Sequence, residues 1–139
     1  MKYRIWDKKE KMYVQDYDDF FVNPDGEIYI VDLYEGINRF CKPDRYVIEQ
    51  YTGLKDKNGK EIYKGDIVYF SVFDYNGLDT QYLGIVKFAN GKWEIWNNEK
   101  DEYYDCDGAF DLYWVKEQDD ELEIIGNIHE NAELLEEKK

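Results

Sequence analysis

The sequence predicts an all-β fold, mainly antiparallel, in which the sheet partly closes on itself. Aromatic residues make up 18% of the 139 residues, and aromatic side chains favour the pleated sheet. Short turn motifs separate apolar segments at three places, namely Asn23-Pro24-Asp25-Gly26, Asn58-Gly59 and Asn90-Gly91. Since tight turns join antiparallel neighbours, this repetition indicates hairpins that build a small curled sheet.

The N-terminal residues are expected to form a hairpin. Residues 2–6 alternate polar and apolar side chains, and an apolar segment resumes at 12–14 after the charged residues 7–11. Alternation with a period of two is typical of a half-buried strand, so the charged segment is expected to be the turn. The alternative interpretation is an exposed tail.

A second hairpin is expected around residues 23–26. Proline suits an early position of a turn and glycine tolerates a positive φ, and apolar segments flank this turn at 20–22 and 27–32. These two segments are therefore predicted to be paired strands. Residues 38–43 are predicted to be a loop, because the proline at its end restricts the preceding residue to extended geometry.

The central segment carries the most specific signals. Residues 44–51 are expected to be extended, and Asn58-Gly59 is the residue choice for a type I′ turn, in which both central positions have positive φ. Gly65-Asp66 resembles the entry to a strand in small SH3-like barrels, with glycine in the turn and the aspartate bonded to nearby backbone. The β-branched and aromatic residues 67–73 are predicted to be that strand.

The following segment is expected to continue the same pattern. Asn90-Gly91 predicts another hairpin, between strands at 85–88 and 93–96. The polar segments 74–82 and 97–108 are predicted to be long connections, and connections of this kind are candidates for partner contact.

The C-terminal part is expected to end in a strand and a short helix. Residues 110–115 fit either a strand or a single helical turn, and residues 121–128 are predicted to be the final strand, interrupted at Gly126. Asn131 is then expected to cap a helix at 132–137, whose two leucines would face inward.

Length and charge restrict the classes of protein that fit. The chain is expected to form one domain, 1–139, with an N-terminal hairpin region at 1–43 and an SH3-like barrel core at 44–130. Its formal net charge is -14, from 18 basic and 32 acidic residues. Such a charge repels nucleic-acid phosphates and anionic membranes, so direct binding to either is not expected. Acids concentrate at 15–37, with seven acids and no base, and at 97–139, with fifteen acids against four bases.

The cysteines and the hydropathy pattern favour a soluble cytoplasmic protein. Cys41 and Cys106 are too few for a disulfide scaffold or a zinc site, and free thiols suit a reducing compartment. No apolar run approaches the roughly 20 residues of a membrane span. Charges interrupt the N-terminus every few positions, so it is expected to be neither a signal peptide nor an anchor.

No catalytic, cofactor-binding or metal-binding residue is predicted. His129 is the only histidine, and its place before the C-terminal helix favours a surface or capping role over that of a general base. Residues 56–59 and 105–108 resemble fragments of a calcium loop, but both lack the spacing to a bidentate glutamate, and turn formation explains them. The glycines form no phosphate-binding motif.

Aromatic residues in and beside the acidic segment are the candidates for a contact surface. They are Tyr103, Tyr104, Tyr113 and Trp114. Tyrosine combines a large contact area with a polar tip, which suits a protein interface. Aromatic platforms for single-stranded nucleic acid come with basic grooves, whereas the charge here is acidic.

A spaced set of residues runs through most of the chain, namely Arg4-Ile5-Trp6-Asp7, Met12, Tyr51-Thr52-Gly53-Leu54-Lys55-Asp56, Asn58-Gly59, Ile62, Gly65-Asp66-Ile67-Val68, Ile125-Gly126-Asn127-Ile128, Glu130-Asn131 and Leu134-Leu135. This set resembles the YopX family of phage and prophage proteins from Gram-positive bacteria. The resemblance implies an SH3-like roll, self-associating members and no assigned enzymatic activity, so no site residues are carried over. The family usually has an aromatic residue where His129 stands, and proline where Ala132 stands, so the helix start is slightly weakened.

Three functional hypotheses are compatible with these features. The leading one is a non-enzymatic phage-encoded interaction protein that forms a homo-oligomer and can contact a host or phage protein. The alternative is an acidic mimic of nucleic acid that occupies a host DNA- or RNA-binding protein through Asp16, Asp18 and Asp19, although solubility explains the same charge. The third is a metal-assisted hydrolase using calcium, magnesium or manganese. It is the least favoured, and the chain is predicted to be neither an enzyme nor dependent on a cofactor.

Overall fold

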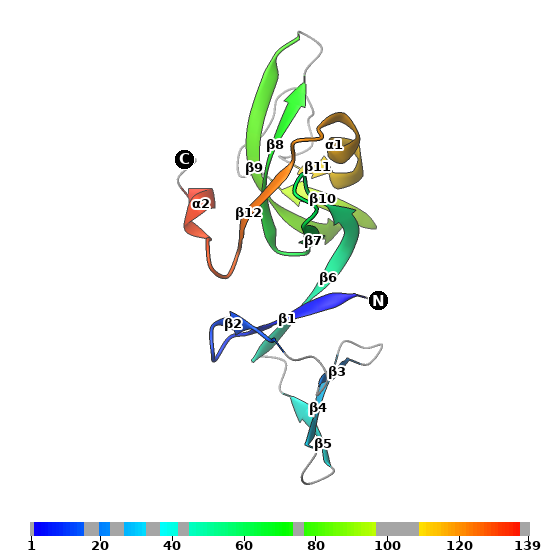
Figure 1. Cartoon of the computed structure of the whole chain (residues 1–139), viewed down its shortest axis with the longest axis vertical. Coiled ribbons are helices and arrows are strands. Elements are labelled where there is room, and N and C mark those ends of the chain that lie inside the picture. The colour runs from blue at the N-terminus through cyan, green and yellow to red at the C-terminus, as the bar shows by residue number, and fades with distance from the viewer. Residues whose placement is uncertain are drawn as a thin grey trace. The chain divides into compact units, whose positions relative to one another are not determined.

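The structure is a computed structural model that describes residues 2–15, 20–22, 27–32, 37–41, 45–73, 77–96 and 109–136. The chain divides into two compact units, Met1–Gln50 and Tyr51–Lys139. Strands dominate the described residues, all of their pairings are antiparallel, and a short helix lies near the C-terminus (Figure 1). The predicted antiparallel β fold with a C-terminal helix is therefore confirmed. The predicted division of one domain into 1–43 and 44–130 stays a prediction.

The first unit begins with the predicted hairpin. Strand β1 (Tyr3–Asp7) pairs with β2 (Met12–Tyr13) and, on its other side, with the first half of β6 (Tyr46–Lys55). Ile5 and Tyr46 are buried and form the core of this small sheet. The prediction of a hairpin, rather than an exposed tail, is thus confirmed.

Asp7 organises the turn of this hairpin. Its Oδ1 accepts hydrogen bonds from the backbone N–H groups of Lys9 at 3.0 Å and Glu10 at 3.3 Å. Arg45 donates from Nε to Oδ1 at 3.1 Å and from Nη2 to Oδ2 at 3.0 Å. These side-chain hydrogen bonds are the main reason why the pKa of Asp7 lies below its usual value, although burial acts in the opposite direction.

A three-stranded sheet follows, in the order β3-β4-β5. Strand β3 (Phe20–Val22) pairs with β4 (Ile28–Asp32), as predicted, while the turn at 23–26 lies outside the described residues. Strand β4 also pairs with β5 (Ile37–Cys41). The predicted loop at 38–43 is therefore wrong for residues 38–41. Strand β5 ends at Cys41, so the proline signal at position 43 does not bear on the residues that pair with β4.

The second unit contains a five-stranded sheet in the order β11-β10-β9-β8-β12. Its elements are β8 (Asp66–Phe73), β9 (Asp79–Ala89), β10 (Lys92–Trp96), β11 (Ala109–Asp111), α1 (Leu112–Gln118) and β12 (Glu123–Asn127). The second half of β6 pairs with β7 (Glu61–Tyr63). The buried core comprises Ile62, Val68, Phe70, Val72, Val86, Trp93, Ile95, Phe110, Leu112, Val115, Leu122 and Ile124. Alternate residues of β8 face this core, as the period of a strand requires.

Two segments of this unit differ from their predicted structure. Strand β9 begins at Asp79, so the predicted connection at 74–82 is wrong for residues 79–82. Residues 110–115, which fitted a strand or a helical turn, contain both, because β11 ends at Asp111 and α1 begins directly after it. The Asp111 carboxylate accepts the N–H of Trp114 at 3.1 Å and caps the helix. The predicted connection at 97–108 lies outside the described residues.

The two Asn-Gly pairs adopt different turns. Asn90 and Gly91 have φ values of 56° and 77°, which confirms the predicted type I′ turn between β9 and β10. At the other pair only Gly59 has a positive φ, of 80°, so the predicted type I′ turn is wrong there. The N–H of Gly59 donates to the carbonyl of Asp56 at 3.0 Å. This geometry fits a type I turn that is followed by a left-handed glycine.

The corrected turn predicts that substitutions at Asn58 and Gly59 lower the free energy of unfolding by different amounts. Gly59→Val is expected to lower the free energy of unfolding by about 1 to 2 kcal/mol, because a β-branched residue is strained at positive φ. A Cβ there would meet no atom within 4 Å, so the cost comes from the backbone alone. Asn58→Ala, the control, is expected to change stability by less than about 0.5 kcal/mol. Urea unfolding of both variants tests this, and an equal cost for the two would contradict the assigned turn.

The strand entry at Gly65-Asp66 is confirmed. Gly65 has a φ of 91°, and the Asp66 carboxylate accepts the N–H of Tyr63 at 2.8 Å. The final strand β12 is interrupted by a register shift between Ile124 and Gly126, as predicted. The C-terminal helix is α2 (Glu133–Glu136).

Asn131 plays another role than the predicted helix cap. Its Oδ1 accepts the N–H of Asn127 at 3.2 Å, so the side chain reaches back to β12. A Cβ at Gly126 would lie 2.6 Å from this oxygen, so glycine is required for the close approach. Of the two leucines expected to face inward, Leu135 is buried and Leu134 is half-buried.

Candidate interaction surface

Strands β8 and β9 extend beyond their neighbours and form a two-stranded arm. Strand β12 pairs with β8 only as far as Tyr69, and β10 pairs with β9 only as far as Ile85. The arm comprises residues 70–73 and 79–84. Residues 79–82 pair with 70–73, and Leu83 and Gly84 continue the ladder to Tyr69 and Val68 without a register shift. Figure 1 shows the two green strands reaching past the other strands of this unit. The sheet thus offers a narrow extension with two edges.

Side chains cover the β8 edge of the arm. The Asp119 carboxylate accepts the N–H of Ser71 at 2.8 Å. The Gln118 side chain donates to the carbonyl of Ser71 at 2.7 Å and accepts the N–H of Phe73 at 3.5 Å. These groups stand where a neighbouring strand would pair, which protects the edge against association.

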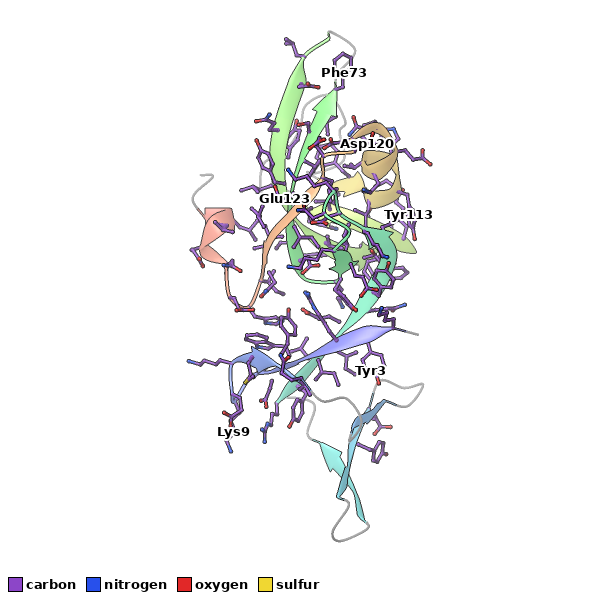
Figure 2. All side chains as sticks on the ribbon, in the orientation of Figure 1. Tyr3, Lys9, Phe73, Tyr113, Asp120 and Glu123 are labelled. Carbon is purple, nitrogen blue, oxygen red and sulfur yellow. The ribbon has the colours of Figure 1, made fainter. Side chains whose placement is uncertain are left out.

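The arm has an anchored inner face and an exposed end. On the inner face, Phe70 stacks on Tyr82 at 5.8 Å between ring centroids and meets Phe110 edge-on at 5.5 Å. At the end, 59% of Phe73 and 64% of Leu78 is exposed. Figure 2 shows Phe73 near the end of the arm. Large exposed apolar residues that gather at one place mark interaction sites.

Helix α1 carries the predicted aromatic residues that the structure describes. Tyr113 and Trp114 are 46% and 41% exposed, and Figure 2 shows Tyr113 on this helix. The Tyr113 hydroxyl donates to the carbonyl of Thr52 at 3.1 Å, so part of this side chain supports the fold. Tyr103 and Tyr104 lie outside the described residues.

The buried carboxylates of the described residues are engaged in structural contacts. Glu49 Oε1 accepts hydrogen bonds from Arg4 Nε and from the Tyr13 hydroxyl, both at 2.8 Å. Glu94 accepts the Asn90 side-chain amide at 3.4 Å. In the part of the chain that the structure describes, no group of three or more His, Cys, Asp or Glu residues could hold a metal ion.

The Asp56 side chain links the β6–β7 turn to β12. Its Oδ1 accepts the N–H groups of Asn58 and Lys60, both at 2.9 Å, and its Oδ2 accepts that of Ile124 at 3.0 Å. Burial is the largest single influence and raises the pKa of Asp56, but the backbone hydrogen bonds together outweigh it and hold the pKa below its usual value. The calcium-like pattern at 56–59 is thus occupied by turn contacts.

The other residues considered as candidate sites are the histidine, the two cysteines and the aspartates of the acidic segments. His129 is half-buried in the turn after β12, and its N–H donates to Asn127 Oδ1 at 3.0 Å. Cys41 ends β5. Cys106 and the pattern at 105–108 lie outside the described residues, as do Asp16, Asp18 and Asp19.

The arm is not predicted from the sequence. Residues 79–82 include an aspartate, a threonine and a glutamine, and this composition favours a polar connection. The signal that could have indicated a strand is that residues 79–84 can pair in unbroken register with the apolar strand that precedes them. Polar residues on a strand are expected when that strand is solvated on one face.

Antiparallel sheets with short turns, and buried carboxylates that bind backbone, define a small β protein. The YopX protein family matches residues 2–136, so the chain belongs to this family. Protein yopX from Bacillus subtilis has a similar crystal structure, with 23% identity, a TM-score of 0.61 and 96% of each chain covered. Protein EF1440 from Enterococcus faecalis is 26% identical, with a TM-score of 0.54 and the same coverage.

Comparison with curated proteins gave no match. Within the described residues, no helix is both long and apolar enough to cross a membrane.

Proposed function

We propose that the chain is a non-enzymatic, phage- or prophage-encoded interaction protein of the cytoplasm that associates with further copies of itself through the arm of an SH3-like roll. The observation that carries this proposal is the exposure of Phe73 and Leu78 at the end of the arm. Their burial against a second copy would remove apolar surface from water, which is the main driving force of association.

The distribution of charge supports a second copy of the chain as the partner that contacts the arm. A net charge of -14 makes copies of this chain repel one another, so the contact is expected where charge is sparse. Residues 69–83 contain two charged residues in fifteen, Asp74 and Asp79, whereas 36% of the whole chain is charged. An apolar contact between copies therefore suits this segment better than it suits the acidic runs.

The structural roles of the buried carboxylates support a non-enzymatic function. Asp7, Asp56 and Asp66 accept backbone N–H groups within their own turns, so each has a sufficient role in folding. The alternative hypothesis of nucleic-acid mimicry stays a prediction, because Asp16, Asp18 and Asp19 lie outside the described residues.

Light scattering behind a sizing column tests self-association. The unchanged chain is expected to elute at a multiple of 16.8 kDa at micromolar concentration. A double variant, Phe73→Ser with Leu78→Ser, is expected to raise the dissociation constant about tenfold or more, because apolar anchors carry most of the energy of an interface. Trp114→Ser serves as the matched control on α1. A strictly monomeric unchanged chain would rule the proposal out.

A further inference from the structure

The turn between β9 and β10 fixes which backbone groups of β9 point outward. Ala89 and Lys92 flank the two-residue type I′ loop, so they exchange hydrogen bonds with each other. Alternation along β9 then directs the backbone groups of Leu83, Gln81 and Asp79 away from β8. The carbonyl of Val86, which is out of phase with this set, accepts the N–H of Gly65 at 2.9 Å on the β8 side, as the alternation requires.

Among the described residues, the outward edge of β9 has a single protective feature, the charge of Asp79 at its start. Among the described residues no strand pairs with residues 79–84 on this side. The stretch from Thr80 to Gly84 has no charge, no proline and no register shift, and these are the devices that keep edges apart. The opposite edge of the same arm is covered by Gln118 and Asp119. Within the part of the chain that the structure describes, the arm is therefore covered along β8 and uncovered along β9.

We propose that two copies of the chain pair their β9 edges antiparallel, about a two-fold axis at Gln81. This pairing rests on the self-association proposed above, and it places the contact at the β9 edge. In this register Gln81 lies opposite Gln81 of the second copy, and Asp79 lies opposite Leu83 of the second copy. All three outward residues of each edge are then paired, with about six hydrogen bonds in total. A shift by two residues leaves one outward residue of each copy unpaired.

Charge favours the antiparallel orientation. The two Asp79 carboxylates stand four residues apart along the ladder, about 13 Å, which exceeds the Debye length of about 8 to 10 Å at physiological salt. An in-register parallel pairing would bring them to about 5 Å. The only charged residue of the edge therefore selects the antiparallel arrangement.

The side chains of the edge fit the same register. Thr80 of each copy lies opposite Tyr82 of the other, and β-branched residues pair well with aromatic ones across strands. In this register Leu78 would come beside Gly84 of the second copy, where Ile95 and the Trp96 carbonyl already occupy the space above the glycine, so the pairing is confined to residues 79–83.

Disulfide trapping tests the register. In a background of Cys41→Ser and Cys106→Ser, Gln81→Cys is expected to form a covalent dimer under mild oxidation, because hydrogen-bonded partners have Cα atoms about 5.5 Å apart. Thr80→Cys is the matched control. Its two copies would be about 8 Å apart, too far for a disulfide. Failure of Gln81→Cys to cross-link, or equal cross-linking by both variants, would overturn the edge pairing.

A proline variant separates this inference from self-association itself. Gln81→Pro removes an outward N–H without removing a backbone hydrogen bond to β8. The exposed hydrogen bond from the Tyr69 hydroxyl to the Gln81 side chain is also lost in the alanine control. Gln81→Pro is therefore expected to keep the melting temperature within a few degrees and to weaken association about tenfold or more. Gln81→Ala is the control and is expected to associate normally. If Gln81→Pro stays as oligomeric as the unchanged chain, the β9 edge is not the contact between copies, although the chain still associates with itself. If the unchanged chain is monomeric, both proposals fail.

Discussion

Replacing Asp56 with alanine is expected to lower the free energy of unfolding by about 3 kcal/mol or more, since each buried N–H group left without a partner costs about 1 to 3 kcal/mol. The carboxylate is buried and accepts three backbone N–H groups, from Asn58, Lys60 and Ile124. The first two hold the β6–β7 turn, and the third ties this turn to β12. Loss of the carboxylate therefore loosens two parts of the second unit together.

Urea unfolding at neutral pH measures this loss. Asp120→Ala is the matched control, because it removes the same charge from an exposed turn residue, and it is expected to change stability by less than about 0.5 kcal/mol. Equal stability of the two variants would contradict the role of Asp56.

The pH dependence of the same comparison gives a second test. The pKa of Asp56 in the folded chain lies below its usual value of 3.8, so the unfolded chain binds the proton more tightly. The carboxylate therefore contributes its full stability above about pH 4, and this contribution is lost as the pH falls through the lower, folded pKa. The stability difference between the unchanged chain and Asp56→Ala is expected to shrink in that window. A difference that grows on acidification would have the wrong sign.

The sequence predicts turns well where the residues of the turn decide its shape. Gly65 and Gly91 both have the expected positive φ, because only glycine adopts it without strain. Asn58-Gly59 has the same two residues as Asn90-Gly91 but adopts another turn. The Asp56 carboxylate binds the N–H groups of Asn58 and Lys60, and this local side-chain contact selects the turn.

Contacts between distant residues could not be predicted in this way. Asp56 and Ile124 are 68 positions apart, and the pairing of β4 with β5 depends on an edge that only the folded sheet provides. The contact surface shows the same limit. The sequence predicts an interface at aromatic residues, of which Tyr113 and Trp114 are exposed. Which edge of a strand is covered depends on where Gln118 and Asp119 meet β8, and the sequence does not show this.

Gly84→Ala is expected to destabilise the second unit by about 3 kcal/mol, the upper part of the range for overpacked cores. A Cβ at this position would lie 2.5 Å from Ile95 Cγ2 and 2.9 Å from the carbonyl oxygen of Trp96. The side chain of Ile95 can rotate, but the carbonyl belongs to β10 and moves only with the strand. For a domain of this size the melting temperature is expected to fall by about 10 °C.

Two further variants identify the cause of the lost stability. Thr80→Ala, on the same strand at an exposed position, is expected to melt within about 2 °C of the unchanged chain. The double variant Gly84→Ala with Ile95→Ala is expected to be less destabilised than the sum of its single changes, because truncation removes the nearer clash and the added methyl fills part of the space. The carbonyl clash persists, so recovery is expected to be partial. Additive losses would show that Ile95 is not the neighbour that requires glycine, and an unchanged melt for Gly84→Ala alone would contradict the close approach of β9 to β10 from which the arm departs.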